Sequence, residues 1–181
     1  MLEIPQSSHL VFRIRLAGPP DAPKLAELAA RLFEQAFGPD NDPEDMRMYL
    51  AGAFSEEAQR KELSDLERRV WIAEDPDGVA IGYAMLRRGG TAPGVEGTQT
   101  AEIQRFYADR TWHGRGLGGA LMQACVDQAR AWTCDVLWLA VWEKNPRAIA
   151  FYEKTGLRTV DRQTFMLGRD VQHDLVMARA L

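Results

Sequence analysis

Hydrophobic and polar positions change their spacing several times along the chain, and each change predicts a different element. Between residues 23 and 37 apolar side chains recur every three or four positions, the spacing of one face of an α-helix. From residue 135 to 142 nearly every position is apolar, as in a strand that is buried on both faces. Glycine and proline between such segments mark turns and helix ends.

The same criteria divide the whole chain into one succession of strands and helices. Strands are predicted at residues 10–16, 70–73, 79–86, 100–108, 135–142, 157–167 and 174–180. Helices are predicted at residues 23–37, 43–53, 55–66, 115–132 and 146–155. This order, with no linker, predicts one mixed α/β domain over residues 1–181 that contains a helical region at about 20–66.

Composition and charge exclude several classes of protein. Of the 181 residues 46% are hydrophobic, which is enough for a core. No apolar run is long enough for a membrane span, and the first residues lack the pattern of a secretory signal. A formal net charge of −4 and scattered arginine pairs do not predict a nucleic-acid-binding surface. Cys125 and Cys134 fit no metal-binding pattern, so we expect a reducing, cytoplasmic protein without a metal site.

A glycine-rich segment between a predicted strand and a predicted helix carries the most chemical information. Residues 112–121 read Trp-His-Gly-Arg-Gly-Leu-Gly-Gly-Ala-Leu. Glycine lets a ligand approach the backbone, and free N–H groups at a helix start bind anions such as pyrophosphate. Gly114, Gly116 and Gly119 also match the G-x-G-x-x-G dinucleotide fingerprint, and Glu143 follows the next strand. Residues 109–113 intervene after the strand and only 62 residues follow Gly119, which weighs against a dinucleotide fold. A purely structural tight turn is the other alternative.

Together with its flanking segments, this stretch resembles the GNAT superfamily of acyl-CoA-dependent N-acyltransferases. The resemblance is carried by residues 102–107, 115–118 and 142–157 and covers about residues 10–181. The superfamily often has Gln or Arg where this chain has His113. The resemblance implies a twisted, mostly antiparallel sheet of about seven strands, which splays between the fourth and fifth strands and is flanked by helices.

A narrower resemblance is to PaiA-type bacterial spermidine/spermine acetyltransferases. It rests on residues 37–38, 41, 43–46, 49–50, 53–55, 62–63, 102–103, 105, 107, 142–144 and 174–175. It implies acetyl-CoA as the acyl donor, a polyamine as the acceptor and the helical region at about 20–66 on the acceptor side. The alternatives are an amine of a protein, peptide, amino acid or antibiotic, and a non-catalytic acyl-CoA sensor. Homodimers are common among such folds, although no exposed apolar stripe in this sequence points to one.

The GNAT resemblance also implies an acyl-CoA site, in which the backbone of the glycine-rich turn holds the pyrophosphate. The predicted cofactor-binding residues are Phe106, Tyr107, Ala108, His113, Gly114, Arg115, Gly116, Leu117, Gly118, Gly119, Asn145 and Tyr152. An N–H group near Phe106 or Tyr107 would polarise the thioester carbonyl. The structural alternatives are core packing for both side chains, a solvated side chain for Arg115 and a helix N-cap for Asn145.

The predicted general acid is Tyr152 and the predicted general base is Glu102. The family places a tyrosine about two turns into this helix, and a phenol with a pKa of about 10 can protonate a departing thiolate. Glu102 would accept the proton of the attacking amine through water, and Glu143 is the reserve base. If the strand alternates regularly, Glu102, Gln104 and Phe106 share one face. The structural alternatives are a packed aromatic ring for Tyr152 and a solvated or ion-paired carboxylate for Glu102.

Acidic residues of the helical region would attract a cationic acceptor. They are Asp40, Asp42, Glu44, Asp45, Glu56 and Glu57. Acidic side chains at a helix start also favour the helix dipole, which is the structural explanation. Tyr49 and Phe54 fit either an acceptor slot or the core. Because neither cysteine lies in a predicted site segment, we expect direct transfer without an acetylated enzyme.

Overall fold

One seven-stranded sheet forms the centre of the computed structural model, which describes residues 12–167 and 169–181. The strands are β1 (Arg13–Leu16), β2 (Arg68–Glu74), β3 (Ala80–Arg88), β4 (Thr100–Ala108), β5 (Val136–Trp142), β6 (Arg158–Leu167) and β7 (Asp170–Ala180). Their order in the sheet is β1-β2-β3-β4-β5-β7-β6. Only the pairing of β4 with β5 is parallel among the described pairs. The predicted mixed α/β fold with a mostly antiparallel sheet is confirmed.

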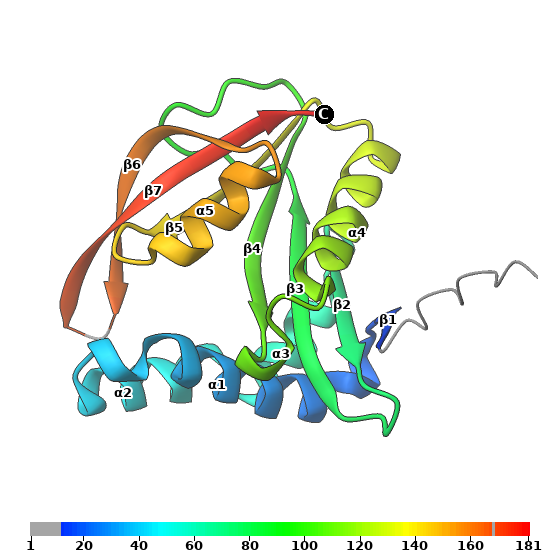
Figure 1. The fold of residues 1–181 in the computed structure, drawn as a ribbon, viewed down its shortest axis with the longest axis vertical. Helices are drawn as coiled ribbons and strands as arrows, with labels where there is room; N and C mark the ends of the chain where they lie inside the picture. Colours follow the sequence, from blue (N-terminus) through cyan, green and yellow to red (C-terminus); the bar gives the residue numbers. More distant parts are fainter. Residues whose placement is uncertain (1–11, 168) are drawn as a thin grey trace, which may run out of the picture.

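Helices lie on both faces of the sheet. They are α1 (Ala22–Phe37), α2 (Pro43–Ala53), α3 (Glu56–Ser64), α4 (Leu117–Ala131) and α5 (Pro146–Lys154), with short 3-10 turns at Pro19–Asp21, Gly38–Asp40 and Arg110–Trp112. In Figure 1, α1 and α2 run across the lower ends of the strands, whereas α5 lies in front of β5 and α4 lies at the right, beside β3. We call the sheet face that packs against α1–α3 the α1 face, and the opposite one the α4 face. No described helix has the length and apolar character that crossing a membrane requires.

The two faces bury separate apolar cores. On the α1 face, the apolar positions of α1 meet side chains of β2 and β3; this core includes Leu25, Leu28, Leu32, Phe33, Ile72, Tyr83 and Met85. On the α4 face, α4 packs against the centre of the sheet; this core includes Leu86, Ile103, Leu117, Leu121, Leu137, Leu139 and Tyr152. The helical spacing seen in residues 23–37 is therefore the stripe that α1 buries.

The main differences from the predicted elements lie at their ends. β7 begins at Asp170 rather than at residue 174, because its first residues pair with the end of β6 in a hairpin. β2 extends over Arg68–Glu74 rather than 70–73. The strand predicted at 10–16 is described from Arg13, and its first two residues lie outside the described residues.

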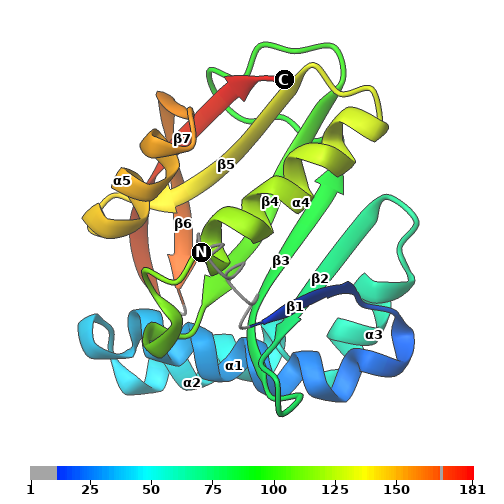
Figure 2. The ribbon, with the colours of Figure 1, turned by 45° about the vertical axis from the view of Figure 1, so that its right-hand side comes forward.

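A split between β4 and β5 is the feature that positions the site. The two strands pair only where Thr100–Glu102 lies beside Val136–Trp138. Beyond these positions they diverge, as Figure 2 shows, while β5 stays paired with β7 up to Trp142. The edge of β4 from residue 103 to 108 is thus left without a neighbouring strand. The predicted splay between the fourth and fifth strands is confirmed.

Candidate active site

The glycine-rich turn joins the end of β4 to α4 and leaves backbone groups open. Gly114 and Gly116 have φ angles of +76° and +85°, and Gly116 is the N-cap of α4. A side chain in this left-handed conformation would be strained, so glycine is required by the backbone. A Cβ atom at Gly114, Gly116 or Gly119 would meet no described atom within 4 Å. The turn therefore presents free N–H groups to a ligand, as an anion site at a helix N-terminus requires.

Other residues of the turn hold it in place. The Nε2 atom of His113 lies 2.9 Å from the carbonyl oxygen of Ala108, and burial lowers the pKa of His113. A neutral imidazole that donates to this carbonyl ties the turn to the end of β4 and supplies no cation to a ligand. The exposed guanidinium of Arg115 lies 5.3 Å from the ring centroid of Trp112. A direct contact of either side chain with CoA stays a prediction.

A bulge in β4 decides which of its side chains face which side. The pairing of β3 with β4 shifts by one residue at Gln104. Glu102 and Tyr107 consequently lie on the α1 face, whereas Phe106 belongs to the core of the α4 face. The expectation that Glu102 and Phe106 share one face is wrong, because regular alternation does not continue through a bulge.

Tyr152 lies in α5, on the α4 face, next to the open edge of β4. Its ring is 6.0 Å from that of Phe106, edge to face, and 7% of the residue is exposed. Burial, with a smaller effect of Cys125, raises the pKa of Tyr152 above its ordinary value. The phenol is therefore protonated at neutral pH, which a general acid requires. Phe106 also stacks on Phe151, so these rings form one aromatic group beside the split.

Glu102 lies where β4 and β5 begin to separate, on the α1 face. It is the last β4 residue paired with β5, opposite Trp138. Its Oε2 atom accepts a hydrogen bond from Gln104 Nε2 (3.1 Å) and lies 4.0 Å from Arg87 Nη1. Burial raises the pKa of Glu102, although Arg87 and Gln104 oppose this. Glu102 and Tyr152 thus flank the split from opposite faces of the sheet.

Two further predicted residues have structural partners. Asn145 Oδ1 accepts a hydrogen bond from the N–H of Ala148 (3.1 Å), so the predicted N-cap is confirmed. Its side-chain NH₂ group takes no part in this bond and stays able to donate to a ligand. Glu143, the reserve base, forms an ion pair with Arg162 (3.2 Å). This partner makes Glu143 a weaker candidate than Glu102.

Aromatic side chains of the helical region lie over the open end of the split. The ring of Phe37 packs against both separated strands. Its centroid lies 6.4 Å from the ring centroid of Tyr107 in β4 and 5.9 Å from that of Trp142 in β5. Tyr49 of α2 stacks on Phe33 at 4.8 Å. The N-terminal helices therefore border the split on the α1 face, where the resemblance implied the acceptor side.

Most acidic residues of the helical region that were candidates for the acceptor already have partners. The side chain of Asp42 caps α2 by accepting from the N–H groups of Glu44 (2.9 Å) and Asp45 (3.2 Å). The ion pairs are Glu44–Arg47, Asp45–Arg169 and Glu56–Arg60. The structural explanation accounts for these four acidic residues. No group of three metal-ligating side chains is found within residues 12–167 and 169–181.

Sequence reasoning counted Asp174 among the residues of the narrower resemblance but gave it no role in the site; it lies on the α1 face next to β5. It pairs across the sheet with Trp142, and the residue is 8% exposed. Burial, together with the nearby Glu143, raises the pKa of Asp174 to about 6. The available signal was an acidic residue at an inward position of a strand, in the series Gln172, Asp174, Val176.

Comparisons with known proteins give the same family. The sequence profile of the acetyltransferase (GNAT) family matches residues 25–157. The chain belongs to the GNAT family. An uncharacterised N-acetyltransferase of Mycobacterium tuberculosis is 35% identical over 161 residues, 89% of this chain and 98% of the relative. One from Lactobacillus delbrueckii is 32% identical over 161 residues, with coverages of 89% and 92%.

A solved structure agrees with this GNAT assignment at the level of the fold. The PaiA N-acetyltransferase of Thermoplasma acidophilum, in complex with coenzyme A, matches with a TM-score of 0.74 and 19% identity, over 94% of this chain and 99% of that one. The GNAT chain described here is an acetyl-CoA-dependent N-acetyltransferase. Its open turn and the unpaired edge of β4 fit a ligand with an anionic end and an extended amide arm.

Proposed function

We propose that the protein transfers the acetyl group of acetyl-CoA directly to a primary amine of a small polyamine such as spermidine or spermine. Residues 1–181 act as a single cytoplasmic domain in this proposal, with the helical region at about 20–66 on the acceptor side. The observation that carries it is the split, which has a raised-pKa carboxyl group on one face and a protonated phenol on the other.

The turn and the open edge of β4 hold acetyl-CoA, which supplies the acyl group as a thioester. The N–H groups around Gly116, at the start of α4, receive the pyrophosphate. The edge of β4 between residues 103 and 107 offers backbone N–H and C=O groups that no strand pairs to an extended arm, as an edge strand does to an added strand. The NH₂ group of Asn145 donates to the same arm, because its oxygen is already used by the helix cap.

Protons leave the nitrogen on one side of the split and reach the sulfur on the other. The acceptor arrives as an ammonium ion and gives one proton to Glu102 through water, which frees the nitrogen lone pair for attack. After the C–N bond forms, the nitrogen loses its second proton to water. As the C–S bond breaks, the phenol of Tyr152 gives its proton to the sulfur and is reprotonated from solvent. Attack from the α1 face and departure towards the α4 face fit the positions of these two side chains.

Both cysteines favour direct transfer over an acetylated enzyme. Cys125 is fully buried, and burial raises the pKa of its thiol. Cys134 is 7% exposed and donates to the carbonyl oxygen of Thr100, 3.4 Å away. Since the thiolate is the nucleophilic form, neither side chain is suited to carry the acetyl group.

The proposal is tested by thiol release from acetyl-CoA with spermidine, spermine, lysine, short peptides and aminoglycosides. We expect turnover with the polyamines, and a decrease in kcat of about 10²- to 10⁴-fold in Tyr152→Phe, the range for losing a general acid. Tyr83→Phe is the matched control, because the Tyr83 hydroxyl is buried without a partner in the described residues. Turnover with peptides or aminoglycosides alone would contradict the polyamine acceptor. CoA binding without turnover of any amine would contradict the enzyme mechanism and favour an acyl-CoA sensor.

A further inference from the structure

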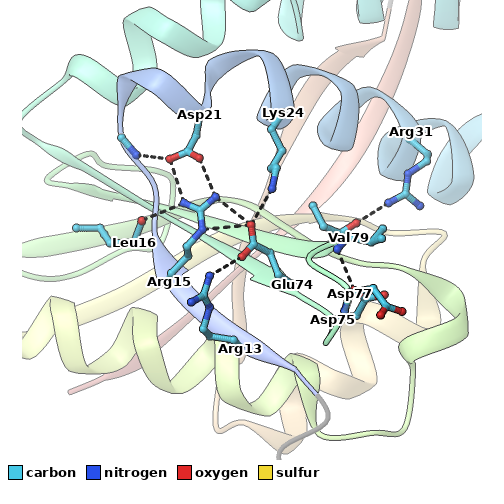
Figure 3. Close-up of polar contacts among 12 residues, drawn as sticks. Arg13, Arg15, Leu16, Asp21, Lys24, Arg31, Glu74, Asp75, Asp77 and Val79 are labelled. Carbon is cyan, nitrogen blue, oxygen red and sulfur yellow. Dashed lines mark hydrogen bonds and ion pairs between the residues drawn. The ribbon is translucent and has the colours of Figure 1, made fainter.

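Three carboxylates of the described chain are almost fully buried, and they differ in their surroundings. They are Asp45, Glu74 and Asp174, at 7%, 5% and 8% exposure. Asp45 is bound by the guanidinium of Arg169. Glu74 is held by several cationic side chains, as Figure 3 shows. Within residues 12–167 and 169–181, the carboxylate of Asp174 has neither an ion pair nor a hydrogen bond. A largely buried carboxylate without a cationic partner is costly, and a ligand that supplies the cation would offset this cost.

Among the described residues, the charged groups that shift the pKa of Asp174 include no permanent cation. Lys144, which follows β5, lies with its Nζ 6.0 Å from the ring centroid of Trp142, the strand partner of Asp174. Glu143 lies just after β5, and His173 is its neighbour on β7; both affect its pKa, and Glu143 has the larger effect. Tyr49 of α2 faces it closely enough for the Asp174 charge to raise the pKa of the phenol. Gln163 of β6 is its cross-strand partner. A negative charge lined by aromatic rings and a neutral amide is suited to an ammonium ion from outside.

Asp174 and Glu102 mark two ends of one stretch of β5. Trp138 is the β5 partner of Glu102, and Trp142 is the β5 partner of Asp174. These two strand positions are about 13 Å apart along β5. Ala140 lies between the two indole side chains on the same face, so the middle of the stretch carries a small side chain. We call this series Trp138, Ala140, Trp142 the β5 track.

We propose that Asp174 binds a second ammonium group of the acceptor, so that the enzyme selects amines with two cationic nitrogens. This inference rests on the proposed function. β5 separates Asp174 from the split, so the nitrogen bound there is not the one that attacks. The attacking nitrogen lies at the split near Glu102, and the chain between the two nitrogens follows the β5 track. The substrate class is therefore an extended diamine or polyamine.

The test compares two acceptors that differ by one ammonium group, diaminooctane and octylamine, with spermidine as a third. For the wild-type enzyme we expect kcat/KM for diaminooctane to exceed that for octylamine by about 10- to 150-fold, the range of a hydrogen bond to a charged group. In Asp174→Asn this preference should disappear, while the KM for acetyl-CoA stays unchanged. Asp170→Asn, an exposed carboxylate on the same strand, is the matched control and should keep the preference.

Three results would overturn the inference: no loss in Asp174→Asn, an equal loss for both amines, or a loss of the same size in Asp170→Asn. An equal loss would place the attacking nitrogen at Asp174. If Asp174→Asn does not fold, Asp174→Glu keeps the charge and should keep most of the preference. If wild type turns over no amine, the proposed function fails separately. In that case calorimetric titration of diaminooctane into the CoA complex tests the Asp174 site by itself. Asp174→Asn should weaken the binding of diaminooctane about 10- to 150-fold, and equal binding by both proteins would overturn the inference.

Discussion

Glu74 and Asp174 are both inward carboxylates of the α1 face, and the fold treats them in opposite ways. Glu74 accepts hydrogen bonds from Lys24 (2.8 Å), Arg15 (3.0 Å) and Arg13 (3.0 Å), and these cations lower its pKa to about 2 (Figure 3). Asp174 has no such partner among the described residues, and burial raises its pKa to about 6. Glu74 joins β1, β2 and α1, whereas Asp174 lies beside the candidate site.

The difference separates a carboxylate that stabilises the fold from one that costs stability. The folded pKa of Glu74 is below its ordinary 4.5, so its contribution is present above about pH 4.5 and is lost as pH falls towards 2. The folded pKa of Asp174 is above its ordinary 3.8, so stability decreases as pH rises from about 3.8 to 6 and stays lower above that. A group that costs stability at neutral pH contributes nothing to the fold there, and we infer that it serves substrate binding.

The largest expected effect is that of Glu74→Gln. Removing the charge leaves its cationic partners without their shared anion, so we expect the free energy of unfolding to fall by about 2–3 kcal/mol at pH 7.5. This corresponds to a decrease in Tm of roughly 5–10 °C for a domain of this size. Urea unfolding at pH 7.5 and at pH 3 measures it, and the loss should shrink at the lower pH. At temperatures below the unfolding transition, the acetyltransferase activity of Glu74→Gln should be unchanged. A decrease in its affinity for the acceptor would show that Glu74, like Asp174, contributes to the site.

Asp174→Asn should change stability in the opposite direction. Replacing the ionised carboxyl group by a neutral amide removes its desolvation cost, so we expect the free energy of unfolding to rise by about 1–2 kcal/mol at pH 7.5. The gain should shrink as pH falls from 6 and vanish below 3.8, where the wild-type carboxyl group becomes protonated in both states. Thermal unfolding of both proteins between acidic pH, below 3.8, and neutral pH measures this. A destabilised variant at pH 7.5 would show that Asp174 has a stabilising partner.

Gln163→Lys would make the surroundings of Asp174 resemble those of Glu74. A lysine at the cross-strand position of β6 can reach the carboxylate, and an opposite-charge pair of this kind contributes about 0.2–1 kcal/mol. We expect a small increase in Tm and a reduced preference for diaminooctane over octylamine, because the lysine occupies the ammonium position. Gln163→Met is the matched control for side-chain length. An unchanged preference in Gln163→Lys would argue against competition at Asp174.

The smallest expected effect is that of Lys24→Met. The Lys24 side chain is 43% exposed, and two arginines remain on Glu74 when it is removed. We expect a loss of less than about 1 kcal/mol, as for other solvent-exposed ion pairs. Urea unfolding in low and in high salt measures it, and the difference should shrink in high salt. A loss as large as that of Glu74→Gln would mean that Lys24 alone supports the cluster.

Local patterns predicted the elements of this fold well, because they depend on residues close in sequence. The spacing of Leu25, Leu28 and Leu32 predicted α1, and all three are buried. Gly116 predicted a backbone turn at the start of a helix, and its φ angle of +85° agrees. The start of β7 was missed, because residues 170–173 become a strand only by pairing with β6.

The site was harder to predict, since its geometry depends on register between distant strands. No glycine marks the bulge at Gln104, which moves Glu102 and Phe106 to opposite faces. The position of Asp174 beside Trp142 follows from the pairing of β5 with β7, which sequence spacing does not reveal. Glu74 follows the predicted strand 70–73, and its burial could not be foreseen because its cations come from β1 and α1. The proposed roles of Tyr152 and Glu102 stay predictions.

The short joint between β4 and β5 makes this sheet two half-sheets connected at one corner. Among the described strands, β1–β4 are joined to β5–β7 by backbone pairing at three positions of β4 and β5. A pantetheine arm bound between the diverging edges would serve as an additional, non-peptide strand and join the halves along their length. The bound acyl donor would then also stabilise the contact between the two halves of the sheet. Its binding would slow amide hydrogen exchange in the strands on both sides of the gap.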